Sequence, residues 1–109
     1  MSPTLAWMAL VTAGLLDVGW AVAMKYAEGY TRLGWTLISL MLLAAFVFLL
    51  GKALQTLEVG IAYAVWTGIG AVGTLVMGVV LFGETLSTIK IAGIGLVLAG
   101  MVTLSFAPQ

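Results

Sequence analysis

The stretch TLAWMALVTAGLLDVGWAVAM, residues 4–24, decides the class of fold, and Asp17 is its one charged residue. A helix of about 21 residues is roughly 31 Å long, enough to cross the hydrocarbon core of a bilayer. A carboxylate at that depth is costly unless it faces a partner or a wet cavity, so it marks a functional site. A structural acid paired with a base is the alternative. No Lys or Arg lies deep in another apolar run, so we expect Asp17 to be functional.

The composition excludes a water-soluble domain. Of 109 residues, 63% are hydrophobic and 7% are charged, whereas soluble domains carry roughly 25% charged residues. The net charge is zero, which gives no reason to expect a nucleic-acid partner. Neither Cys nor His occurs, so disulfides, thiolate or imidazole metal sites and the usual catalytic bases are excluded. We expect an integral membrane protein that is not an enzyme and holds no metal or cofactor.

Four apolar runs are separated by short polar breaks, and no linker is long enough to divide the chain into domains. The break at residues 26–32 is a turn, and the break at 51–58 is partly helical. The chain is therefore predicted to be one all-α domain over residues 1–109, with an up-down-up-down path across the membrane. The expected transmembrane helices span residues 4–25, 33–50, 59–82 and 88–106.

Basic residues set the orientation of membrane proteins, but here they are nearly balanced. Lys25, Arg32 and Lys90 lie on the side of the first and third connections. Lys52 and the terminal amine lie on the other side. Two interpretations remain open: a fixed topology, or insertion in both orientations with antiparallel pairing.

The face of the first helix around Asp17 combines small residues with one aromatic ring. Gly14 lies three residues before Asp17 and Trp20 three residues after it, so all three share one helix face. The ring and the carboxylate together suit a desolvated cation. Small residues serve helix packing in lipid equally well, so a cavity and a packing contact both remain open.

The third helix has the densest cluster of polar and small residues. One face is formed by residues at i, i+3, i+4 and i+7, namely Tyr63, Trp66, Thr67 and Gly70. Polar groups inside a membrane need partners, and Asp17 is the simplest joint partner for them. Gly68 and Gly70 predict a bend or hinge in this helix.

The fourth helix carries a glycine pattern typical of helix–helix contact. Gly93 and Gly100 are seven residues apart, and no charged residue follows Lys90. A single four-helix unit with one buried acid encloses little space for a substrate. We therefore expect this helix to form a dimer contact that brings two acids together.

At this point the sequence resembles the small multidrug resistance transporters over nearly its whole length. The resemblance rests on the acid in the first helix, KYAEGYTRL at 25–33, GIAYAVWTGIGAVG at 60–73 and GETL at 83–86. Trp20 and the WTGIGA motif at 66–71 are more similar to the guanidinium-exporter subtype than to the quaternary-ammonium subtype.

The resemblance implies a proton-coupled antiporter that works as an antiparallel dimer in the bacterial inner membrane. Asp17 would bind either protons or a cationic substrate, which is a guanidinium-type or quaternary ammonium ion. Trp66 would orient the acid, and Gly93 and Gly100 would supply the dimer contact. The pocket would be lined by Gly14, Trp20, Phe46, Tyr63, Trp66 and Thr67.

Four positions depart from the family pattern. Asp17 stands where the family has Glu, and Phe46 stands where guanidinium exporters have a serine that hydrogen-bonds the acid. Glu58 replaces a proline, and Ser105 replaces a lysine near the end of the fourth helix. Two further hypotheses therefore stay open. One is a subunit of an obligate heterodimer with a paralogue, and the other is a non-transporting scaffold or small pore.

Overall fold

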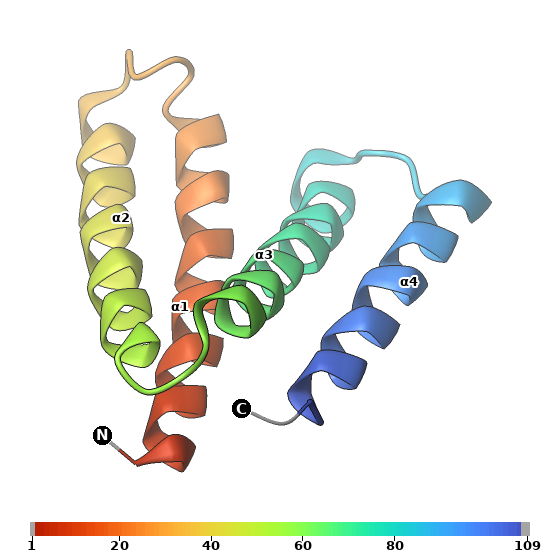
Figure 1. The fold of residues 1–109 in the computed structure, drawn as a ribbon. Coiled ribbons are helices and arrows are strands. Elements are labelled where there is room, and N and C mark those ends of the chain that lie inside the picture. Colours follow the sequence, from red (N-terminus) through yellow and green to blue (C-terminus); the bar gives the residue numbers. More distant parts are fainter. Residues whose placement is uncertain (1, 108–109) are drawn as a thin grey trace.

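The computed structural model describes residues 2–107, which form four helices: α1 (Pro3–Tyr26), α2 (Leu33–Leu54), α3 (Val59–Phe82) and α4 (Thr88–Ser105). The described residues contain no strand. All four helices are long and apolar enough to cross a membrane. The α1–α2 and α3–α4 connections lie at one end of the molecule, and the α2–α3 connection lies at the other (Figure 1). The predicted all-α fold with four membrane spans is confirmed.

The ends of three helices differ from those expected: α1 is one residue longer at each end, α2 is longer at its end, and α4 ends one residue earlier, at Ser105. α1 begins one residue earlier, at Pro3, because Ser2 caps it by accepting a hydrogen bond from the Leu5 backbone N–H at 3.2 Å. α2 continues to Leu54, although polar residues predicted a break after residue 50. Ala53 is fully buried in the core, and this packing keeps the last turn of α2 helical.

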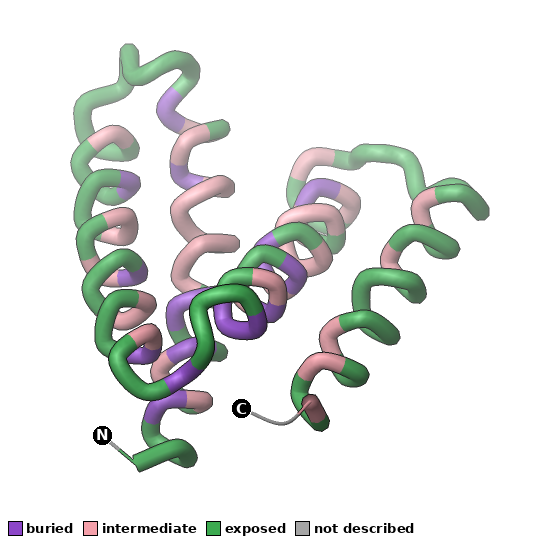
Figure 2. Tube along the Cα trace, viewed as in Figure 1, coloured by how far each residue is buried: buried purple, intermediate pink, exposed green. Residues whose placement is uncertain are grey.

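The helices are packed unevenly. α1 contacts both α2 and α3, whereas α4 contacts only α3. The core lies where the beginning of α1 meets the α2–α3 connection, and the buried segments in Figure 2 mark this place. No residue of α4 is buried. The core consists of Ala6, Leu10, Ala53, Leu57, Ile61, Ala62 and Val65.

α1 and α3 approach closely because glycines on one helix receive side chains of the other. A Cβ atom added to Gly14 would lie 2.6 Å from Cγ2 of Ile69, closer than real contacts allow. A Cβ atom at Gly73 would overlap Val18 in the same way. Small residues at such contacts let helices pack tightly in lipid, where no hydrophobic force draws them together.

Replacing Gly14 with alanine should therefore destabilise the protein. Ile69 is branched at Cβ, and its Cβ would lie only 2.8 Å from the added methyl group, so rotation of the side chain cannot relieve the clash. Overpacking of this kind costs about 1–3 kcal/mol. Thermal unfolding in detergent should show a lower midpoint for Gly14→Ala.

Gly19→Ala is the matched control on the same helix. Its added Cβ would meet Leu42 Cδ1 at 3.5 Å, an ordinary contact. Alanine also favours helix by about 1 kcal/mol over glycine, so this variant should be as stable as the parent or more so. A Gly14→Ala protein at least as stable as Gly19→Ala would contradict the packing argument.

Candidate functional site

Asp17 lies in the middle of α1 and is half-buried. Its Oδ2 atom occupies the space beside Gly70 of α3, where a Cβ atom would overlap it. Within residues 2–107, no side chain or backbone group forms a hydrogen bond or ion pair with the carboxylate. The acid therefore reaches the surface of α3 because position 70 has no side chain, and its own bonding capacity remains unused.

An open groove with a volume of about 500 Å³ runs beside this carboxylate. It lies between α1 and α3 and reaches the α3–α4 connection. Two carboxylates and two hydroxyl groups interrupt a mainly apolar lining, which is typical of a site for a small cation. The groove is lined by Asp17, Ala21, Thr67, Gly70, Ala71, Thr74, Leu75 and Glu84.

The four aromatic side chains expected at the site lie in one continuous row. The ring centroids of Trp20 and Phe46 are 5.4 Å apart, and those of Phe46 and Trp66 are 5.6 Å apart. Tyr63 continues the row at 5.4 Å from Trp66. Phe46, on α2, is only 3% exposed. Its ring lies between Trp20 of α1 and Trp66 of α3. The row thus joins rings from three helices, but none of them lines the groove that holds Asp17, so a pocket shared by these rings and the acid stays a prediction.

The hydrogen bond expected from Trp66 to Asp17 is not formed. The indole Nε1 of Trp66 is buried and has no hydrogen-bond partner among residues 2–107. The indole ring of Trp66 packs against the ring of Phe46, and a phenyl ring offers no hydrogen-bond acceptor to the indole N–H. A buried donor without a partner is uncommon and calls for an explanation.

Three of the remaining predicted residues lie in three different places in the structure. Thr67 lies in the groove with Asp17. Gly14 lies beneath Ile69, in the contact between α1 and α3, and Gly68 lies beneath Met101 of α4.

Nothing lies within 4 Å of the Cβ positions of Gly93 and Gly100, so this part of α4 is open. α3 is helical through Gly68 and Gly70, and a hinge there stays a prediction.

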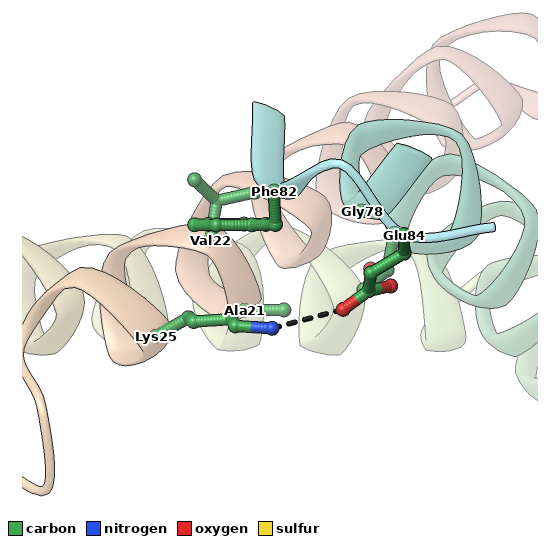
Figure 3. A pocket seen from close by; sticks show the side chains of 7 residues that line it. Ala21, Val22, Lys25, Gly78, Phe82 and Glu84 are labelled. Atoms are coloured by element: carbon green, nitrogen blue, oxygen red, sulfur yellow. Dashed lines mark hydrogen bonds and ion pairs between the residues drawn. The ribbon is translucent and has the colours of Figure 1, made fainter. Parts of the chain in front are cut away.

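Sequence reasoning did not single out the ion pair at the end of the groove. Lys25 Nζ lies 2.9 Å from Glu84 Oε2 and 4.6 Å from the centroid of the Phe82 ring. A cavity of about 60 Å³ adjoins the pair and shares Ala21, Thr74 and Glu84 with the groove (Figure 3). The sequence did contain a signal for this pair. Lys25 is the first charged residue after the first apolar span, Glu84 is the first after the third span, and both spans end on the same side of the membrane.

The ion pair changes the titration of Glu84. The hydrogen bond and the positive charge of Lys25 hold the pKa of Glu84 below its ordinary value of 4.5. A group with a lowered pKa in the folded state stabilises the fold above its unfolded pKa. That contribution is lost as the pH falls through the folded pKa.

The variant Lys25→Gln should raise the pKa of Glu84 toward 4.5 and remove this part of the pH dependence of stability. Carbon NMR of the labelled Glu84 carboxyl, titrated with acid, measures the change. Lys52→Gln is the control, since Lys52 lies on α2 over the Phe48 ring and should leave Glu84 unaffected. The same Glu84 pKa in the parent and in Lys25→Gln would contradict the assigned cause.

Comparison with known proteins agrees with this architecture. The model of the Small Multidrug Resistance protein family matches residues 5–97. Proteins named guanidinium exporter from Yersinia pseudotuberculosis and Yersinia pestis are each 52% identical over 103 residues, which cover 94% of this chain and 99% of the relative. A guanidinium exporter from Citrobacter freundii is 43% identical and is covered over 98% of its length. The chain therefore belongs to the small multidrug resistance protein family.

Proposed function

We propose that this protein exports small guanidinium-type cations across the bacterial inner membrane in exchange for protons. The observation that carries the proposal is Asp17, a carboxylate inside a membrane span that faces a groove and has no partner in residues 2–107. The names of the similar proteins support guanidinium as the substrate class.

The chemistry of the groove suits a planar cation with N–H donors. A guanidinium presents its donors in a rigid fork that matches the two oxygens of a carboxylate. The hydroxyl groups of Thr67 and Thr74 offer further acceptors along the same wall. A quaternary ammonium ion has no N–H donor and would use only the negative charge of the groove. We therefore place guanidinium-type ions first and quaternary ammonium ions second.

Competition for one carboxylate supplies the coupling. Asp17 accepts a proton or faces a cation, and each form excludes the other. If the groove opens to the two sides of the membrane in turn, a proton bound on one side is exchanged for a cation bound on the other. A ligand shifts such an equilibrium only through a difference in its affinity for the two states. The protonation of Asp17 provides that difference.

The working unit that we propose is an antiparallel dimer, with α4 as the contact. No residue of α4 is buried within the chain, and the surface at Gly93 and Gly100 is open. A paralogue in place of a second copy would give a chain that is inactive until mixed with its partner.

Asp17→Asn should abolish exchange, because an amide cannot carry the proton or pair with the cation at this site. The measurement is uptake of labelled guanidinium into liposomes, driven by an outward-directed proton gradient. Asp17→Glu is the control that keeps the charge, and it should retain exchange. Guanidinium-driven proton flux that persists in Asp17→Asn would disprove the central role of this residue.

Gly70→Ala tests the position of the carboxylate without removing it. The added Cβ would occupy the place of Asp17 Oδ2, so the acid must turn away from its observed position. We expect the dissociation constant for guanidinium to rise about tenfold or more, equivalent to about 1.4 kcal/mol. Calorimetric titration measures it. Gly60→Ala on the same helix, with no atom within 4 Å, should bind like the parent. Equal affinities in the two variants would show that the acid does not act from this position.

A further inference from the structure

The groove has a second carboxylate, and a continuous wall connects it to the first. On α1, Ala21 and Lys25 follow Asp17 at intervals of four residues, so Lys25 lies about 12 Å further along the helix. On α3, which forms the facing wall, Gly70 lies beside Asp17 and Gly78 lies beside Glu84. These two glycines are separated along α3 by the same number of residues as Asp17 and Lys25 on α1. Thr74, halfway between the two glycines, lines both cavities. The groove and the adjoining cavity thus extend from the carboxylate of Asp17 to that of Glu84.

Glu84 is held in place by the backbone rather than by burial. Its N–H donates to the Gly78 carbonyl at 3.1 Å, and its Oε1 occupies space that a side chain at Gly78 would fill. The carboxylate therefore points to the groove from the α3–α4 connection. About half of the side-chain surface of Glu84 and of Lys25 is exposed, so water and ions reach the pair.

Lys25 contacts Glu84 in the way that a bound organic cation would. Its ammonium donates a hydrogen bond to the carboxylate and lies over the Phe82 ring. A carboxylate beside an aromatic face is a general binding arrangement for organic cations. Exposed ion pairs contribute little net stability, so the pair can exchange its cation without unfolding the protein.

We propose that Glu84 is an outer binding site for the transported cation and that Lys25 occupies this site until the cation displaces it. The ligand class is a small cation with N–H donors, such as guanidinium. The step is an exchange of one cation for another, so the carboxylate is never left unpaired. The role of this site in transport rests on the function proposed above, whereas binding at Glu84 does not.

The exchange would also change how α1 and α4 are connected. Within residues 2–107 these two helices share no packing contact, and the Lys25–Glu84 pair connects α1 to the segment that leads into α4. Displacement of Lys25 removes this connection at the end of the groove. The arriving cation thereby replaces a link between α1 and the α3–α4 connection, at the end of the groove that also holds Asp17.

The experiment that tests the site uses the full-length Asp17→Asn protein, in which the inner site is disabled. Guanidinium is titrated while NMR follows the labelled Glu84 carboxyl carbon and the Lys25 ammonium nitrogen. We expect both signals to shift and saturate together, and an equal concentration of sodium chloride to give no saturating shift. Glu28, which pairs with Arg32 at 2.9 Å in the α1–α2 connection, is the control carboxylate and should not respond in this way. No saturating shift at Glu84, or the same shift at Glu28, would overturn the proposal.

Two variants separate a binding site from a purely structural ion pair. Adding Lys25→Gln to the Asp17→Asn protein removes the resident competitor, so guanidinium should bind Glu84 about threefold or more tightly. In the protein with Asp17 intact, Glu84→Gln should lower the initial rate of guanidinium uptake by about threefold or more, since a charge at the rim changes association. Glu28→Gln removes the same charge elsewhere and should leave the rate unchanged. A structural pair predicts no gain of affinity in the first variant, and that result would overturn the proposal.

The outcomes also distinguish the two proposals. If Asp17→Asn still exchanges cations for protons, the proposed function fails whatever happens at Glu84. If exchange depends on Asp17 but Glu84 shows no saturating response, only the outer site fails.

Discussion

The structure depends on the contact between a carboxylate and a glycine on the neighbouring helix. A charged group inside a membrane span is tolerated where it faces a cavity or a partner. Asp17 meets this condition because Gly70 lets its Oδ2 lie against α3, at the edge of an open groove. The side chain is too short to reach far from its own helix, so the two helices must be close. Gly14 and Gly73, beneath Ile69 and Val18, make that approach possible.

The aromatic row shows how one substitution is accommodated in such a protein. Phe46 stands at a position where the resemblance to guanidinium exporters implies a serine, and it is almost fully buried between Trp20 and Trp66. It replaces a hydroxyl with a ring that can only pack. The indole N–H of Trp66 is then left without a partner among residues 2–107. Packing among rings is gained, while a buried polar group loses the acceptor that a hydroxyl could have offered.

The uneven packing of the helices divides the chain into two parts. α1, α2 and α3 share the core, whereas α4 touches α3 alone and buries none of its residues. At Gly68 the two helices meet through Val97 and through Met101, whose flexible side chain can adapt to its surroundings. A helix attached along one side is free to present its other side to lipid or to a second subunit. The groove between α1 and α3 reaches the α3–α4 connection, which leads into this loosely packed helix.

The sequence alone determined the class of protein and the four spans, because hydrophobic length is a local property, and it singled out Asp17 as the one charge inside the first span. It predicted a face shared by Tyr63, Trp66 and Thr67 toward Asp17, since a regular helix fixes the angle between residues, but only Thr67 lines the groove with the acid. It predicted that the break at 51–58 is partly helical but not that α2 runs on to Leu54, where Ala53 is buried in the core. The roles of Gly14 and of the Lys25–Glu84 pair were decided only by the tertiary structure, because both depend on which residues of α3 lie opposite α1. That register is set by packing between helices, and spacing within one helix carries no information about it.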